Sequence, residues 1–279
     1  MKKTEIPIDC DKYFLNGDFI SQENYVLIND RKQIFRNGEL LEIKGNYTFV
    51  FPKVRIISDN QFLLVDSEKP YEANNKDPNA WVINNNGKIE YALFLGSVNQ
   101  MILTKKHIIA SYSDSQLDTH WKYGQNGLVV FDFEGNSLFE YYRDEGKSKC
   151  LNFIENYAFL EKDKDTIYYM PYEKFPIVEF SLIDFSSKVL FNLPDEKSIE
   201  MNHFWNPKAF SKKGENWYFI TPDIENNFSR IFKMNLKMEI EEIGTCCFSH
   251  FPKGLKEGCF FVPFSGGKGL QRKCQYIEV

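Results

Sequence analysis

One hairpin pattern recurs along this chain at a nearly constant interval, and the recurrence limits the folds that the chain can adopt. Each copy has a run rich in β-branched and aromatic residues, a short turn and a second run, which is the pattern of two antiparallel strands. The turns are centred on Asn37-Gly38, Asn86-Gly87, Glu134-Gly135, Phe185-Ser186 and Leu236-Lys237, which follow one another at 48 to 51 residues. A fixed period of about fifty residues indicates one supersecondary unit that is repeated.

The stretch from Ser97 to Arg143 shows one whole unit. Its four short apolar or alternating runs predict strands at Met101–Thr104, His107–Tyr112, Gly127–Phe133 and Ser137–Tyr142. None of these runs keeps the 3.6-residue apolar period that an amphipathic helix requires. Four short antiparallel strands in each unit predict an all-β fold in which every unit is one blade of a β-propeller.

The two ends of the chain indicate how the repeat closes. The last unit has a third strand at Lys273–Val279 but no fourth, while the strand-like segment Lys2–Ile8 precedes the first complete unit. If the N-terminal strand joins the C-terminal blade, the ring closes and an exposed sheet edge is removed. We therefore predict a single domain over residues 1–279, with six blades of four antiparallel strands. Five blades with irregular ends is the alternative.

The pattern resembles the six-bladed β-propeller superfamily over essentially the whole chain. Strings such as GLVVFDFEGNSLFEY at 127–141 and DTIYYMPYEKFPIVEFSLID at 165–184 carry this resemblance, and the Gly-His and Trp-Asp signatures of WD40 repeats are absent. Metal-dependent lactonases and related hydrolases of this architecture hold a cation at the channel. Their ligands match no residues here one by one, so the resemblance implies a fold and leaves the function open.

Composition excludes several classes of function. The net charge is −5 and the isoelectric point is about 5.6, which argues against nucleic acid as a partner. No apolar run approaches the length of a membrane span, and the N-terminus lacks the apolar core of a signal peptide, so we expect a cytoplasmic monomer. The six cysteines have no metal-binding spacing and are expected to be reduced thiols.

The long polar insertions predict where a ligand binds. They include residues 66–80, 113–126, 194–202 and 265–269, which join the second and third strands of a blade or join one blade to the next. Connections of these two kinds emerge on the same face of a propeller. That face is the candidate binding site.

Aromatic, acidic and imidazole side chains fall in or beside these loops. The candidate binding residues are Trp81, Asp114, Asp118, His120, Trp121, His203 and Trp205. Exposed tryptophans would stack on a flat or apolar group, although they could equally fold back over the blade tops. Aspartates after a second strand, Asp30, Asp66 and Asp223 among them, could ring a channel mouth, but aspartate is also a common turn residue.

These residues support two classes of function. The first is a binding module without cofactor that captures a protein or peptide, with loop acids favouring a basic partner; an inhibitor or immunity protein is one form of it. The alternative is a hydrolase of an ester, lactone or sugar that holds a divalent cation, with His120, His203 and His250 as the possible ligands. A carbohydrate-binding protein is a third possibility. Motifs of serine hydrolases, zinc peptidases, P-loops and dinucleotide sites are absent from the sequence.

Overall fold

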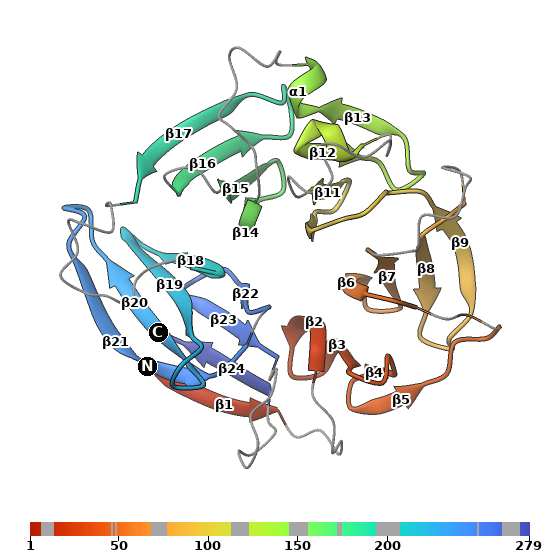
Figure 1. The fold of residues 1–279 in the computed structure, drawn as a ribbon, viewed down its shortest axis with the longest axis horizontal. Coiled ribbons are helices and arrows are strands. Elements are labelled where there is room, and N and C mark those ends of the chain that lie inside the picture. Colours follow the sequence, from red (N-terminus) through yellow and green to blue (C-terminus); the bar gives the residue numbers. More distant parts are fainter. Residues whose placement is uncertain are drawn as a thin grey trace. The chain divides into compact units, whose positions relative to one another are not determined.

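The strands form six four-stranded sheets, as predicted. A computed structural model describes residues 1–6, 14–45, 47, 49–67, 77–112, 123–144, 156–171, 175–193, 207–249, 251–263 and 274–279. In five sheets the strands follow chain order and pair with their sequence neighbours, and in the sixth the order is β1-β24-β23-β22 (Figure 1). The fold is a six-bladed β-propeller, and its sheets are divided between two compact units.

The first unit is built essentially from Asn16–Asn156 and holds three sheets. Sheet one contains β2 (Phe14–Ser21), β3 (Asn24–Asn29), β4 (Ile34–Arg36) and β5 (Glu39–Leu41). Sheet two contains β6 (Pro52–Ser58), β7 (Gln61–Asp66), β8 (Ala80–Asn84) and β9 (Ile89–Leu93). Sheet three contains β10 (Gln100–Leu103), β11 (Ile108–Ser111), β12 (Leu128–Phe131) and β13 (Ser137–Glu140), with the 3-10 turn η2 (Gly124–Asn126) before β12 and the helix α1 (Tyr141–Asp144) after β13.

The second unit holds the other three sheets and both chain ends. Sheet four contains β14 (Asn156–Asp163), β15 (Thr166–Pro171), β16 (Pro176–Ser181) and β17 (Ser187–Asn192). Sheet five contains β18 (Ala209–Lys213), β19 (Asn216–Asp223), β20 (Phe228–Met234) and β21 (Ile240–Cys247). Sheet six contains β22 (Lys253–Gly254), β23 (Cys259–Val262), β24 (Cys274–Glu278) and β1 (Lys2–Ile6).

The N-terminal strand completes the C-terminal blade, as the sequence predicts. β1 pairs antiparallel with β24, with Lys2 opposite Glu278 and Ile6 opposite Cys274. Because β24 is flanked by β23 on one side and β1 on the other, its two edges are both paired and neither is left open to another chain.

All five predicted hairpin turns lie between the third and fourth strands of a sheet. Gly38 and Gly87 take positive φ values of 89° and 72°, where glycine has no Cβ penalty. The turns of sheets four and five lack glycine, and Phe185 and Met238 take the left-handed conformation instead. Some strand boundaries differ from the prediction. The strand expected to run to Phe133 ends at Phe131. The strand expected to run to Tyr142 ends at Glu140, whose backbone N–H donates to the carboxylate of Asp144 in α1.

Buried aromatic and branched side chains fill the space between the sheets of each unit. The largest side chains that are almost wholly buried are Tyr or Phe, among them Tyr112 in the first unit and Tyr169 in the second. Rings of this size bury about 150–250 Å² each, which suits the gap between two packed sheets. Among the described residues, no helix has the length and apolar content needed to cross a bilayer.

Buried charged groups on β6 join the three sheets of the first unit. The Arg55 guanidinium donates from Nε to the Met101 carbonyl at 2.9 Å and from Nη1 to Asn16 Oδ1 at 3.1 Å. Burial lowers the pKa of Arg55, and the Asp18 carboxylate opposes that shift. Lys53 Nζ donates to the Val98 carbonyl at 2.7 Å. Strand β6 therefore contacts sheets one and three through paired polar groups as well as apolar ones.

The described cysteines are not joined in disulfides. Cys246, Cys247, Cys259 and Cys274 form no disulfide; Cys10 and Cys150 lie outside the described residues. Burial raises the pKa of the adjacent thiols of Cys246 and Cys247, and the pKa of Cys247 reaches about 12. A thiol that stays protonated at neutral pH is a poor nucleophile.

We expect Cys246 and Cys247 to resist thiol reagents in the folded protein. Iodoacetamide labelling near pH 8, followed by mass spectrometry, should modify this pair only after urea is added, because the thiolate fraction is negligible in the native state. The same residues labelled in urea provide the internal control. Rapid native labelling of either cysteine would contradict the burial that the structure shows.

Candidate functional site

The structure describes one of the seven residues that the sequence proposes for binding. Trp81 lies in β8, where its side chain is 8% exposed and packs in the core between sheets one and two. The other six, which are Asp114, Asp118, His120, Trp121, His203 and Trp205, lie outside the described residues, as does His250. Their role at a binding face stays a prediction.

Two of the loop aspartates accept hydrogen bonds from backbone N–H groups. Asp66 is 2% exposed, and its carboxylate accepts the N–H groups of Val50 at 2.9 Å and Phe51 at 2.8 Å. Asp223 accepts bonds from Asn226 and from Arg230, the latter at 2.7 Å. For Asp66 and Asp223 the turn-residue interpretation is therefore confirmed. Within the described part of the chain, no group of three or more His, Cys, Asp or Glu side chains is placed to hold a metal ion.

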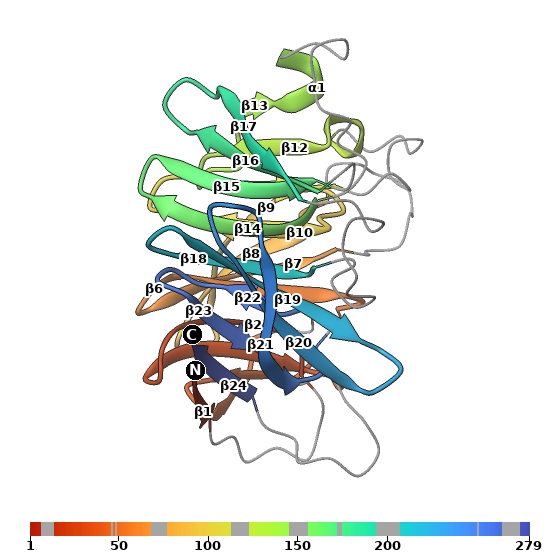
Figure 2. The same cartoon turned by 90° about the vertical axis from the view of Figure 1, so that its left-hand side faces the viewer.

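Asp223 lies at the end of the long hairpin formed by β19 and β20 (Figure 2). Burial alone would raise the pKa of its carboxyl, but the hydrogen bonds from Asn226 and Arg230 outweigh burial and lower the pKa. A carboxylate whose folded pKa lies below its unfolded value of about 3.9 stabilises the fold above that pH. The stabilisation is lost as the pH falls through the folded pKa.

We expect Arg230→Gln to lower stability by about 1–3 kcal/mol near pH 6, because the variant weakens a charge-assisted contact with a buried carboxylate. The difference from wild type should shrink as the pH falls from about 4 through the lowered folded pKa of Asp223, below which the carboxyl is protonated in both proteins. Urea unfolding of both proteins over this pH range measures the difference in the free energy of unfolding. Lys233→Gln is the control, because its partner Glu241 is 60% exposed and such pairs contribute about 0–1 kcal/mol. An equal Arg230→Gln deficit at every pH would contradict the assignment.

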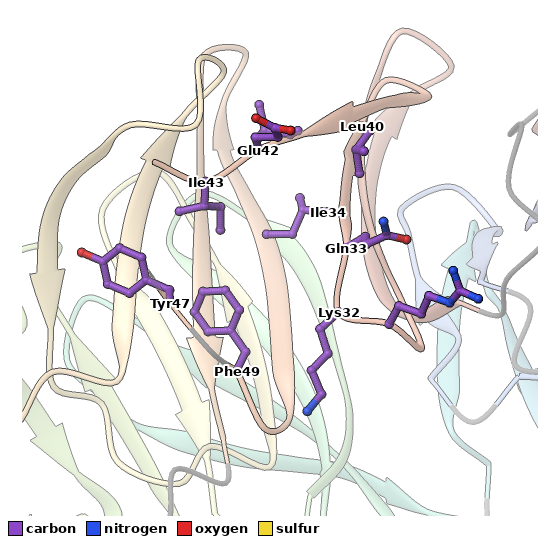
Figure 3. Close-up of a pocket in the computed structure, with 10 residues that line it drawn as sticks. Lys32, Gln33, Ile34, Leu40, Glu42, Ile43, Tyr47 and Phe49 are labelled. Atoms are coloured by element: carbon purple, nitrogen blue, oxygen red, sulfur yellow. The ribbon is translucent and has the colours of Figure 1, made fainter. Parts of the chain in front are cut away.

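A groove of about 480 Å³ opens on sheet one (Figure 3). It lies between the β3–β4 turn, strands β4 and β5, and the segment that connects β5 to sheet two. The lining side chains are Arg31, Lys32, Gln33, Ile34, Leu40, Leu41, Glu42, Ile43, Tyr47 and Phe49. The volume lies in the range of ligand sites, about 300–1,000 Å³.

An aromatic cluster supports one wall of the groove. The Tyr47 and Phe49 rings are stacked with centroids 6.4 Å apart, and Trp81 meets Phe49 edge-on at 5.4 Å and Tyr47 at 6.0 Å. Phe49 is buried, whereas Tyr47 is 43% exposed. Trp81 thus lies behind the groove wall and positions the ring that faces solvent.

The turn at the basic end of the groove is held by a buried asparagine. Asn29 Oδ1 accepts the N–H groups of Arg31 at 3.0 Å and Gln33 at 2.9 Å, and the Asn29 carbonyl accepts the Lys32 N–H. Lys32 takes a φ of 63°, a conformation that costs a lysine of order 1 kcal/mol. The backbone that carries these two cations is therefore fixed before any ligand arrives.

The sequence predicts the location of this groove only in part. The β3–β4 turn joins second and third strands, and residues 42–51 join one blade to the next, so both belong to the kinds of connection assigned to the binding face. However, none of the long polar insertions named in the sequence falls in the first blade. Its outer strand β5 has only three residues, and the segment after it packs against Trp81 instead of extending the sheet. The aromatic residues of 45–51 (GNYTFVF) were the available signal.

Comparison with known proteins identifies the fold alone. No protein-family model matches the chain, and no curated protein matches its sequence. A solved protein of unknown function from Bacteroides thetaiotaomicron superposes with a TM-score of 0.58 at 8% identity, covering 99% of this chain and 71% of its own. The soluble aldose sugar dehydrogenase from Escherichia coli superposes with a TM-score of 0.57 at 7% identity, covering 99% of this chain and 98% of the dehydrogenase chain. A chain of a nidogen/laminin complex superposes with a TM-score of 0.51 at 14% identity, covering 85% of this chain and 80% of that one.

Proposed function

We propose that this propeller is a binding module that captures a protein or peptide segment in the groove of sheet one and on the loops at the same end of the blades. The observation that carries the proposal is the combination of an apolar groove with exposed aromatic and charged side chains. Interfaces are anchored by aromatic residues in pockets and surrounded by polar groups. The nidogen/laminin chain shows that a fold of this kind occurs in a protein complex.

Two further exposed apolar side chains follow the groove lining in the chain. Val50 and Phe51 follow Phe49 and are 39% and 42% exposed, while the Asp66 carboxylate and the Ser67 hydroxyl bond the backbone of this pair. Exposed apolar side chains on a fixed backbone lose little conformational freedom on binding. This favours an extended macromolecular segment over a small solute that would fill the groove alone.

Selection from a random peptide library on the immobilised protein tests the proposal. Peptides that bind wild type with about micromolar affinity should lose binding to a Leu40→Ser, Tyr47→Ser variant. The matched control is Leu138→Ser with Tyr91→Ser, since these side chains are 42% and 41% exposed in the same unit. No enrichment on wild type, or an equal loss in both variants, would overturn the groove as a binding site.

A second pair of substitutions tests the loop residues. Asp118→Ala with Trp121→Ala should also weaken the selected peptides if the loops share the site. Loss in this variant, with the groove variant unchanged, would place the site on the loops and exclude the groove. Unchanged binding would remove these two residues from the proposed site.

A further inference from the structure

The two ends of the groove carry opposite charge. In Figure 3 the Lys32 side chain lies at one end and Glu42 at the other, with Ile34 between them and Phe49 beside Lys32. Arg31 precedes Lys32 in the β3–β4 turn and also lines the groove. Asp30 precedes them in the chain but does not line the groove. A ligand therefore meets a cationic end, an apolar floor and an anionic end in that order.

The charged groups at the two ends are open to a partner. Within the part of the chain that the structure describes, Arg31, Lys32 and Glu42 form no ion pair, and all three side chains are exposed. A ligand carboxylate near Lys32 would thus break no existing bridge. The fixed turn also reduces the conformational entropy that ordering these cations costs.

The floor between the ends accepts a large apolar side chain. Ile34 is 2% exposed and Phe49 is 8% exposed, whereas Leu40 and Tyr47 at the rim are 54% and 43% exposed. A side chain that entered between the rim residues would bury its own surface and part of theirs. Burial of apolar surface contributes about 25 cal/mol per Å².

We infer that the groove binds an extended peptide segment in which a large apolar side chain is flanked by acidic residues on the side of Arg31 and Lys32. This inference rests on the proposed function and specifies the chemistry of the partner. Opposite charges across an interface favour the correct partner, and like charges oppose the wrong one. Glu42 repels an acidic residue at the other end, so the segment binds in one direction.

Fluorescence anisotropy with synthetic peptides tests the inference. The probe is a labelled peptide Glu-Asp-Gly-Leu-Phe-Gly-Lys-Ser, and three comparison peptides carry inverted charges, the reverse order, or serine in place of Leu-Phe. The probe should bind roughly tenfold more tightly than each of the three, and its affinity should fall as salt is raised. Equal binding of the probe and the charge-inverted peptide would overturn the inference.

Lys32→Asn removes the cation and keeps the turn, since asparagine tolerates the left-handed conformation. We expect it to weaken the probe roughly tenfold. Lys105→Asn, in an exposed turn of sheet three, should leave affinity unchanged within about twofold. Gly45→Ala tests the wall, because a Cβ there would lie 2.4 Å from the Tyr47 ring and displace it. Unchanged probe binding in the Lys32→Asn variant would remove Lys32 from the site.

The two failures can be distinguished. If library peptides bind and depend on Tyr47 but carry basic or neutral residues, the inference fails and the proposed function stands. If neither the library nor the probe yields binding, the proposed function fails. Melting temperatures of each variant, measured alongside, separate loss of binding from loss of the fold.

Discussion

Arg55→Met is expected to destabilise the protein by about 3–5 kcal/mol. The substitution keeps most of the side-chain volume but removes the guanidinium donor from the Met101 carbonyl and from Asn16 Oδ1, which then accepts only the Val54 N–H. It also leaves the buried Asp18 carboxylate without the guanidinium whose charge favours it. Removing one partner from a buried network of charged and hydrogen-bonded groups is among the largest effects that a single substitution produces. Urea unfolding at neutral pH measures the loss.

Arg31→Met is the matched control for this prediction. Arg31 is exposed and the chemical change is the same, so we expect a change within about 0.5 kcal/mol. Combining Asp18→Asn with Arg55→Met tests the cause, because the double variant should be less destabilised than the sum of the single ones. Additive losses, or an Arg55→Met protein as stable as wild type, would contradict a structural role for this buried charge.

The repeat itself could be predicted because its determinants are local. Strand runs and turns are encoded within a few residues of one another, and the pairing of β1 with β24 follows from a missing strand at one end and a surplus one at the other. The left-handed turns at Phe185 and Met238 show that the period is set by the spacing of strands and not by glycine alone.

The groove could not be predicted fully because its determinants come from different sheets. Trp81 follows a polar loop in sequence, which favours exposure, yet it is buried against Phe49 and Tyr47 from the segment before β6. In the sequence, Lys32 and Arg31 are indistinguishable from ordinary turn residues. They line a groove only because β5 is short and leaves space beside the turn. Arg55 likewise has no signal of burial in its own strand, because its partners belong to β2 and β10.

Gly87→Ala is expected to destabilise the protein by about 2–4 kcal/mol and to weaken ligand binding in the groove. Gly87 has a φ of 72°, and a Cβ there would lie 1.8 Å from the Glu42 carbonyl oxygen. That contact is with backbone, so rotation of a side chain cannot relieve it. The Gly87 carbonyl also accepts the Lys44 N–H at 2.9 Å. An added methyl group must therefore separate the β8–β9 turn from the segment that leaves β5.

Gly214→Ala isolates the effect of this close approach. Gly214 also has a positive φ, 58°, but nothing lies within 4 Å of a Cβ built there, so the substitution should cost only the conformational penalty of roughly 1 kcal/mol. Urea unfolding of both variants measures the difference, and probe anisotropy should show weaker binding only for Gly87→Ala, since Glu42 and Tyr47 are carried by the displaced segment. Equal stability losses for the two variants would mean that the backbone of residues 42–44 moves away from the added methyl group with no loss of stability. The Gly87 contact would then not hold the wall of the groove in place.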